Sequence, residues 1–85
     1  MKTGVAGTKE SNDALISVFE SDMLEIEIQS IVDLMYHDQI EKVIRETLKE
    51  EHIQNIRVVC VDKGALDYTI RARLITALKR MKSDD

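Results

Sequence analysis

The stretch Leu24-Glu25-Ile26-Glu27-Ile28-Gln29 alternates apolar and polar side chains without a break. Successive side chains of an extended strand point to opposite faces, so the pattern puts the apolar residues on one face and the polar ones on the other. We therefore predict a β-strand over Met23–Ser30 with one buried face and one wet face. This strict alternation argues against a helical bundle and favours a sheet.

Two other segments are rich in β-branched and apolar residues, as strands are. They are Ala14–Phe19 (A-L-I-S-V-F) and Ile56–Asp62 (I-R-V-V-C-V-D). The short polar connection Glu20-Ser21-Asp22 predicts that Ala14–Phe19 and Met23–Ser30 form a hairpin. Ile56–Asp62 is apolar on both faces at its centre, which is typical of an interior strand covered by helices.

Helical spacing governs two further stretches. The first helix is expected after Ser30, with Ser30 and Asp38 as alternative N-caps, and the second from about Tyr68 to Met81, with Asp67 as its N-cap. The predicted buried stripes are Ile40, Val43, Ile44, Thr47 and Leu48 in the first helix, and Ile70, Leu74, Ala77, Leu78 and Met81 in the second. The predicted fold class is α+β, a small two-layer sandwich in the order β-β-α-β-α with both helices on one sheet face. An extra N-terminal strand stays open.

The bulk properties restrict the function. A chain of 85 residues forms one domain, residues 1–85. The net charge of −4 argues against nucleic-acid binding, because an acidic surface repels phosphate backbones. The single cysteine, Cys60, excludes an internal disulfide, and no Cys/His pattern suggests zinc. No signal peptide or long apolar run is visible, so we expect a cytoplasmic protein without a membrane association.

The stretch Val5-Ala6-Gly7-Thr8-Lys9-Glu10-Ser11-Asn12-Asp13 carries the strongest functional signal. Its small and polar residues favour turns, so residues 1–13 are expected to form an exposed loop or an edge strand. The hydroxyl of Ser11 should be accessible to another enzyme. A lone serine in such a context would ordinarily be a surface turn residue.

A second motif, Val61-Asp62-Lys63-Gly64-Ala65-Leu66-Asp67, is followed by Arg71-Ala72-Arg73-Leu74. Together with the Ser11 stretch it resembles the citrate lyase acyl carrier protein family, the gamma subunit of that complex. The family pattern is A-G-T-x-E-S-x-D at the serine, with V-x-D-K-G-A-L-D and R-A-R-L downstream. The resemblance covers nearly the whole chain. It implies that Ser11 is a covalent attachment site and that the chain itself is a non-catalytic carrier.

The resemblance further implies a cofactor and partners. The cofactor would be 2'-(5''-triphosphoribosyl)-3'-dephospho-coenzyme A, attached covalently at Ser11, and its thiol would carry acetyl or citryl groups while citrate is cleaved to acetate and oxaloacetate. The partners would be the alpha (transferase) and beta (citryl lyase) subunits and a holo-carrier synthase. Glu10 and Asp13 are expected to help an enzyme or partner recognise the loop. The alternatives are a malonate decarboxylase carrier, or an interaction module without a prosthetic group.

Docking residues are the last candidates. The segment Asp67–Lys82 holds five basic residues and one acidic residue, so the second helix presents a basic stripe on an acidic chain. Such a stripe is usually just a solvated face. The alternative is a docking surface for an acidic patch on a partner. The proposed docking residues are Gly64, Asp67, Arg71, Arg73 and Arg80. Gly64, expected at positive φ, and Asp67 could also lie near Ser11.

Overall fold

The computed structural model describes residues 2–30 and 34–83 and contains four strands and two helices in the order β-β-β-α-β-α. This confirms the predicted α+β class and places the additional strand at the N-terminus. The elements are β1 (Thr3–Ala6), β2 (Ala14–Phe19), β3 (Glu25–Ser30), α1 (Leu34–Glu50), β4 (Arg57–Asp62) and α2 (Asp67–Lys82).

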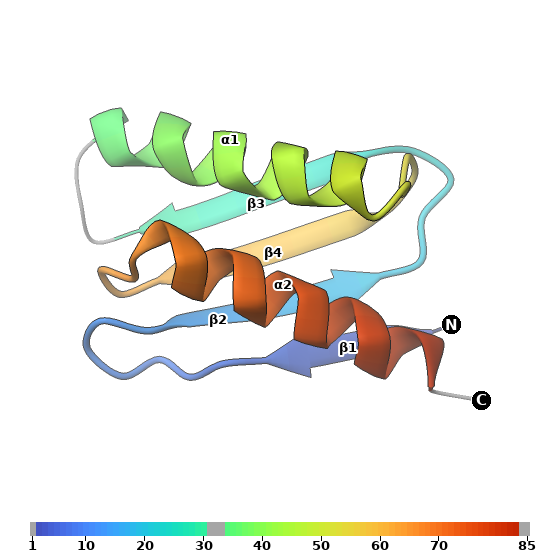
Figure 1. The fold of residues 1–85 in the computed structure, drawn as a ribbon, viewed down its shortest axis with the longest axis horizontal. Coiled ribbons are helices and arrows are strands. Elements are labelled where there is room, and N and C mark those ends of the chain that lie inside the picture. Colours follow the sequence, from blue (N-terminus) through green and yellow to red (C-terminus); the bar gives the residue numbers. More distant parts are fainter. Residues whose placement is uncertain (1, 31–33, 84–85) are drawn as a thin grey trace.

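The strands form one mixed sheet in the order β1-β2-β4-β3 (Figure 1). β1 and β2 form an antiparallel hairpin, β2 and β4 are antiparallel, and β3 and β4 are parallel and joined through α1. The register places Ile16 opposite Cys60, and Cys60 opposite Ile28 on the other side. The predicted hairpin between β2 and β3 is therefore wrong, because β4 lies between them.

The composition of the strands explains this order. The centre of β4 is apolar on both faces, and an interior position pairs both of its edges. β3 carries Glu25, Glu27 and Gln29 on its solvent-exposed face. Charged side chains are common on edge strands, where they discourage pairing with another chain, so β3 suits the edge of the sheet. Arg57 of β4 pairs with both glutamates at N–O distances of 3.4 and 3.2 Å, which fixes β3 alongside β4.

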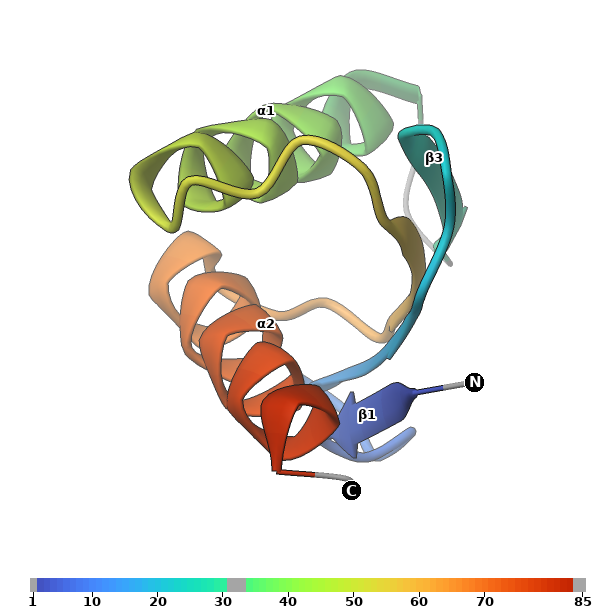
Figure 2. The same ribbon diagram turned by 90° about the vertical axis from the view of Figure 1, so that its right-hand side faces the viewer.

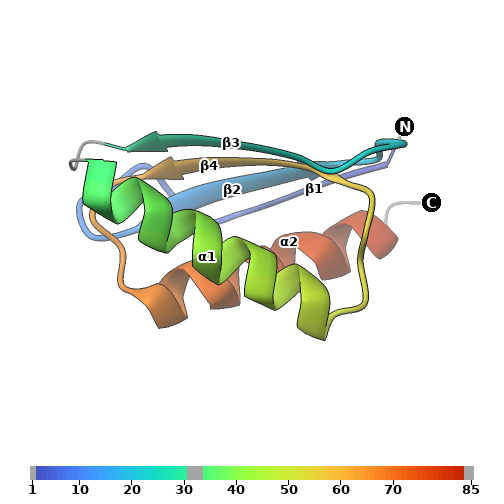
Figure 3. The same ribbon diagram turned by 90° about the horizontal axis from the view of Figure 1, so that it is seen from above.

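Both helices cover the same face of the sheet, and the opposite face is uncovered (Figures 2 and 3). The interior strand β4 is therefore covered by helices on one face only. The predicted stripe of α1 is buried throughout, and that of α2 is buried except for Met81, which is partly buried against the core. The core between the layers is completed by the inward-facing residues of the strands, among them Ile16, Val18, Val58 and Cys60.

The helix ends differ from the predicted caps. Ser30 is the last residue of β3 and Asp38 lies inside α1, so neither caps that helix. The N-cap of α2 is Leu66, which makes no side-chain capping bond, and Asp67 is the first helical residue. Asp67 nevertheless lies in the first turn, where an acidic side chain interacts favourably with the positive end of the helix dipole.

β1 packs closely against α2 because it contains a glycine. A Cβ at Gly4 would approach the carbonyl oxygen of Ala77 to 1.9 Å and the amide nitrogen of Met81 to 2.7 Å. Only a residue without a side chain lets the strand and the helix meet here. The N-terminal edge of the sheet is thereby held under the last helix, and this fixes where the following loop begins.

Candidate functional site

The loop Gly7–Asp13 joins β1 to β2 and carries Ser11 at its tip. It ends in a four-residue turn, in which the amide of Asp13 donates a hydrogen bond to the carbonyl oxygen of Glu10 over 3.1 Å. Asn12 is the third residue of this turn and has a φ of 66°, a conformation that asparagine tolerates better than most residues. The side chain of Ser11, the second residue, is exposed as predicted.

The Ser11 turn lies against the turn that joins β4 to α2, at the left end of Figure 1. The Asn12 amide donates to the Lys63 carbonyl oxygen over 2.8 Å, and the Lys63 amide donates to the Asp13 carbonyl oxygen over 2.9 Å. Gly64 has a φ of 92°, as predicted, and a Cβ on it would lie 3.6 Å from Asn12 Oδ1. Two motifs that are far apart in the sequence thus meet at one end of the sheet.

The carboxylate of Asp13 anchors the loop. Its Oδ1 accepts hydrogen bonds from the Ala14 amide (2.7 Å) and Arg73 Nε (3.0 Å), and its Oδ2 accepts from the Thr8 hydroxyl (2.8 Å) and a second Arg73 nitrogen (3.1 Å). These bonds, with Arg73 contributing most, then Thr8 and then the Ala14 amide, lower the pKa of Asp13 from 3.8 to about 2. A bidentate arginine fixes both position and orientation of a carboxylate. The base of the Ser11 turn is therefore tied to α2.

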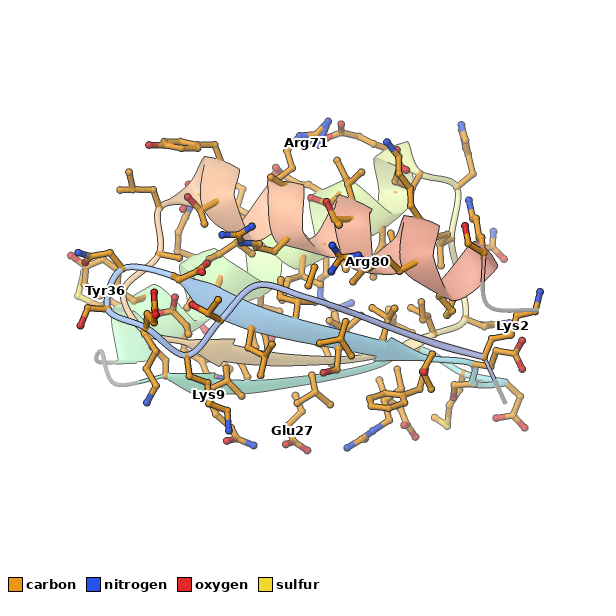
Figure 4. The ribbon with its side chains drawn as sticks, turned by 90° about the horizontal axis from the view of Figure 1, so that it is seen from below. Lys2, Lys9, Glu27, Tyr36, Arg71 and Arg80 are labelled. Atoms are coloured by element: carbon orange, nitrogen blue, oxygen red, sulfur yellow. The ribbon has the colours of Figure 1, made fainter. Side chains whose placement is uncertain are left out.

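The arginines of the predicted basic stripe make contacts within the molecule. Arg73 holds Asp13, Arg71 pairs with Glu50 of α1 over 2.8 Å, and Arg80 donates to the carbonyl oxygen of Val5 over 2.7 Å. Figure 4 shows Arg80 lying between α2 and β1. The three arginines thus join α2 to α1, to the Ser11 loop and to β1.

A pocket of about 300 Å³ opens beside the β4–α2 turn. It is lined by Tyr36, Gln39, Ile40, Asp62, Gly64, Ala65, Leu66 and Asp67. Tyr36 and Leu66 expose 58% and 59% of their surface, although both are large apolar residues. Tyr36 lies at the same end of the molecule as the Ser11 loop (Figure 4). Asp67 accepts a hydrogen bond from Gln39 Nε2 over 2.8 Å and so links the start of α2 to α1.

Asp62 is a buried carboxylate in the wall of this pocket. Its Oδ1 accepts from the Ala65 amide over 2.9 Å, and its Oδ2 accepts from the Ser30 hydroxyl over 3.0 Å. Burial and the negative charge of Asp62 raise the pKa of the Cys60 thiol to about 12. Cys60 therefore stays protonated and unreactive at neutral pH.

Residues 2–30 and 34–83 show neither a metal site nor a membrane-spanning helix. No group of three or more His, Cys, Asp or Glu side chains in these segments is placed to hold a metal ion. Neither described helix is long and apolar enough to cross a membrane.

The exposure of Ser11 and the positive φ of Gly64 agree with the sequence predictions, but the sequence did not predict the side-chain contacts around them. The Asp13–Arg73 pair joins residues 60 positions apart, and no local pattern reveals such a pairing. The pocket was also missed, because Tyr36 and Leu66 come from α1 and from the β4–α2 turn. The one signal available was composition: Tyr36 is one of only three aromatic residues in the chain.

A family model and curated relatives match most of this chain. Residues 1–81 match the family model described as the malonate decarboxylase delta subunit. The citrate lyase acyl carrier protein of Lactobacillus acidophilus is 48% identical over 79 residues, covering 92% of this chain and 81% of the relative. The protein of the same name from Treponema denticola is 42% identical over 79 residues, covering 93% and 91%.

A solved structure shares the fold. The RNase P protein of Staphylococcus aureus superimposes with a TM-score of 0.56 and 16% identity, covering 95% of this chain and 84% of that protein. At this identity the likeness shows the fold alone. The family model and the curated relatives, in contrast, match most of the sequence. The chain therefore belongs to the family of citrate lyase acyl carrier proteins.

Proposed function

We propose that Ser11 is the covalent attachment site of a dephospho-coenzyme A type arm, on which the chain carries acyl groups in the citrate lyase complex. The observation that carries this proposal is the exposed Ser11 side chain at the tip of an anchored turn. Within the described residues no hydrogen bond occupies its hydroxyl. The curated relatives are named acyl carriers of citrate lyase, which supports the same role.

The surroundings of Ser11 fit an arm joined through phosphate. Lys9 is exposed two residues before Ser11, and the backbone of Lys63 bonds to both Asn12 and Asp13. Two ammonium groups thus belong to segments that border the attachment point, where they would offset phosphate charge. The carboxylate fixed at the base of the turn, Asp13, is neutralised by Arg73.

The attachment reaction requires little of the chain. The Ser11 oxygen forms a bond to a phosphorus of the triphosphate donor, the bond from that phosphorus to the departing phosphates breaks, and the hydroxyl proton passes to a base of the modifying enzyme. An unactivated serine suffices, because the modifying enzyme supplies the base. The turn presents the hydroxyl in a fixed position, which favours that encounter.

Once attached, the arm supplies a thiol that holds the acyl group as a thioester. The chain contributes a stable body that moves as a unit between two active sites. We propose that these belong to a transferase subunit, which exchanges acetyl for citryl, and a lyase subunit, which releases oxaloacetate and leaves acetyl on the carrier. The chemistry resides in the cofactor and the partner subunits.

A second candidate is the carrier of malonate decarboxylase, because the matching family model bears that description. This carrier would use the same attachment point with a malonyl or acetyl group. Acyl exchange separates the two: purified holo-protein is incubated with each transferase, and the acyl group it acquires is identified by mass.

Intact-mass measurement tests the attachment site itself. The chain is co-produced with the modifying enzymes, and wild type should gain the mass of one arm, while Ser11→Ala should gain none. Ser83→Ala is the matched control, since Ser83 is also exposed and should not affect loading. Loading of Ser11→Ala at the wild-type level would exclude Ser11.

A further inference from the structure

We propose that the pocket beside the β4–α2 turn is a resting site for the acylated end of the arm. This inference rests on the proposed attachment at Ser11. The pocket volume of about 300 Å³ lies at the lower end of the range of ligand pockets, about 300–1,000 Å³. A volume of this size can hold the thioester end of the arm and the chain next to it.

The attachment point borders the pocket. Gly64 lines the pocket, and a Cβ added at this position would lie 3.6 Å from Asn12 Oδ1. Asn12 directly follows Ser11 in the chain. The Asn12 amide also bonds to Lys63, which precedes Gly64. An arm that begins at Ser11 therefore starts at the rim of the pocket and can fold back into it.

The lining matches a neutral, amide-bearing chain. Tyr36, Ile40 and Leu66 provide an apolar wall, and Tyr36 and Leu66 would lose their unfavourable exposure when covered. Asp62 and Asp67 are the two acidic residues of the same wall. A carboxylate accepts up to about four hydrogen bonds, and among the described residues Asp67 accepts one, from Gln39 Nε2, which leaves it capacity for the amide N–H groups of a pantetheine-like chain.

The same two carboxylates decide which acyl group enters. Asp62 is buried, with 2% of its surface exposed, and Asp67 lies at the mouth beside α1. Negative charge in a partly buried wall repels further negative charge. The pocket should therefore accept the neutral acetyl thioester and reject both the citryl thioester and the phosphates of the arm.

Tethering makes even a weak site effective. A group on a short flexible tether is present at an effective concentration on the order of millimolar. A pocket with a dissociation constant on the order of millimolar would then be about half occupied. Such a site shields the acyl group part of the time and still releases it to a partner active site.

The test compares the carrier without the arm, with the free arm, with the acetylated arm and with the citryl arm, by backbone NMR. We expect acetylation to shift the signals of Gly64, Ala65 and Leu66 in addition to those of residues 10–13. The citryl form should lose the shifts at 64–66. Intact mass establishes loading in each sample.

Leu66→Asp is the variant that closes the pocket to the arm. Leu66 is the exposed N-cap of α2, where aspartate is favoured, so the variant should fold. Met23→Asp is the matched control, because Met23 is 56% exposed in the connection at the opposite end of the sheet. Hydroxylamine should cleave the acetyl thioester about twofold faster in Leu66→Asp than in wild type or Met23→Asp, given half occupancy.

The outcomes separate the two proposals. A missing arm on Ser11 would overturn both. Acetylated protein whose shifts stay within residues 10–13, with equal cleavage rates in the three proteins, would overturn the pocket and leave the attachment site standing. Shifts at 64–66 that appear only when a partner subunit is added would also overturn it, since the exposed Tyr36 and Leu66 would then be a protein-docking surface.

Discussion

Gly7 should be far more sensitive to alanine than Gly64, although both have positive φ, 95° and 92°. The backbone conformation alone costs an alanine about 1–2 kcal/mol at either position. The added Cβ has space at Gly64, where Asn12 Oδ1 is 3.6 Å away. At Gly7 it would meet the carbonyl oxygen of Ala14 at 1.8 Å, so backbone must move.

The structure sets the size of the difference. Overpacking of this kind costs typically about 1–3 kcal/mol, so Gly7→Ala should lose about 2–5 kcal/mol and Gly64→Ala about 1–2 kcal/mol. A domain of this length has a total stability of about 4–13 kcal/mol, at about 0.05–0.15 kcal/mol per residue. Gly7→Ala therefore threatens the whole fold, or detaches β1 and the Ser11 loop from it.

Two measurements check this prediction. Urea unfolding followed by circular dichroism gives the loss of stability of each variant. The rate at which the modifying enzyme loads the arm reports on the Ser11 turn, and it should fall more for Gly7→Ala than for Gly64→Ala under conditions where both are folded. Equal losses of stability in the two variants would refute the close approach of Gly7 to Ala14.

Three further predictions address charge and burial. The pKa of Asp13 is lowered from 3.8 to about 2, so its ionised form stabilises the fold above about pH 4 and this contribution is lost as pH falls towards 2; urea midpoints of Asp13→Asn should lack that dependence, and an unchanged profile would contradict the Arg73 contact. Cys60, buried with a pKa of about 12, should react with iodoacetamide only after unfolding, and rapid labelling of native protein would contradict its burial. Replacing the exposed Lys79 and Lys82 by Glu should lower the free energy of unfolding by about 1–2 kcal/mol, because both lysines lie in the last turn of α2, where positive charge interacts favourably with the helix dipole. The change should also weaken subunit association at low salt, relative to Lys49→Glu in the last turn of α1, and unchanged association would make these two lysines a solvated face.

Most helices and strands could be predicted from the sequence, because the spacing of apolar residues along an element shows which of its faces is buried. The alternation at 24–29 gave β3 and its wet face, and helical spacing gave the buried stripes of α1 and α2. Ala14–Phe19 was predicted with its observed bounds. β1 stayed an open alternative, since four residues that include Gly4 carry little strand signal by themselves.

The order of the strands was beyond local reasoning. A short polar connection between two strands usually makes a hairpin, and β2 and β3 have such a connection. The order depends on which strand takes the interior position. β4 takes it because its centre is apolar on both faces, whereas β3 carries polar residues on one face. This comparison needs all four strands together. A prediction from consecutive strands alone therefore paired β2 with β3 instead of β4.

The site divides in the same way. Ser11 follows from the motif, and the positive φ of Gly64 follows from its place between a strand and a helix. The role of Arg73 does not, because the sequence of a basic helix predicts only a solvated face or a docking surface for it. A charged residue on an amphipathic helix is assigned to solvent or to a contact only when the opposing element is known, and here that element is Asp13.

The mixed sheet explains why the functional features gather at one end. β3 and β4 are parallel, so both finish there, and β2, antiparallel to β4, begins there. The Ser11 loop that precedes β2 and the Gly64 turn that follows β4 must therefore be neighbours, whichever side chains they carry. Had β2 and β3 formed the hairpin, no strand pairing would link the Ser11 turn to Lys63. The position of β4 thus places the proposed attachment site beside the pocket, and the contacts of Arg73 with Asp13 and of Arg80 with Val5 join the Ser11 loop and β1 to α2.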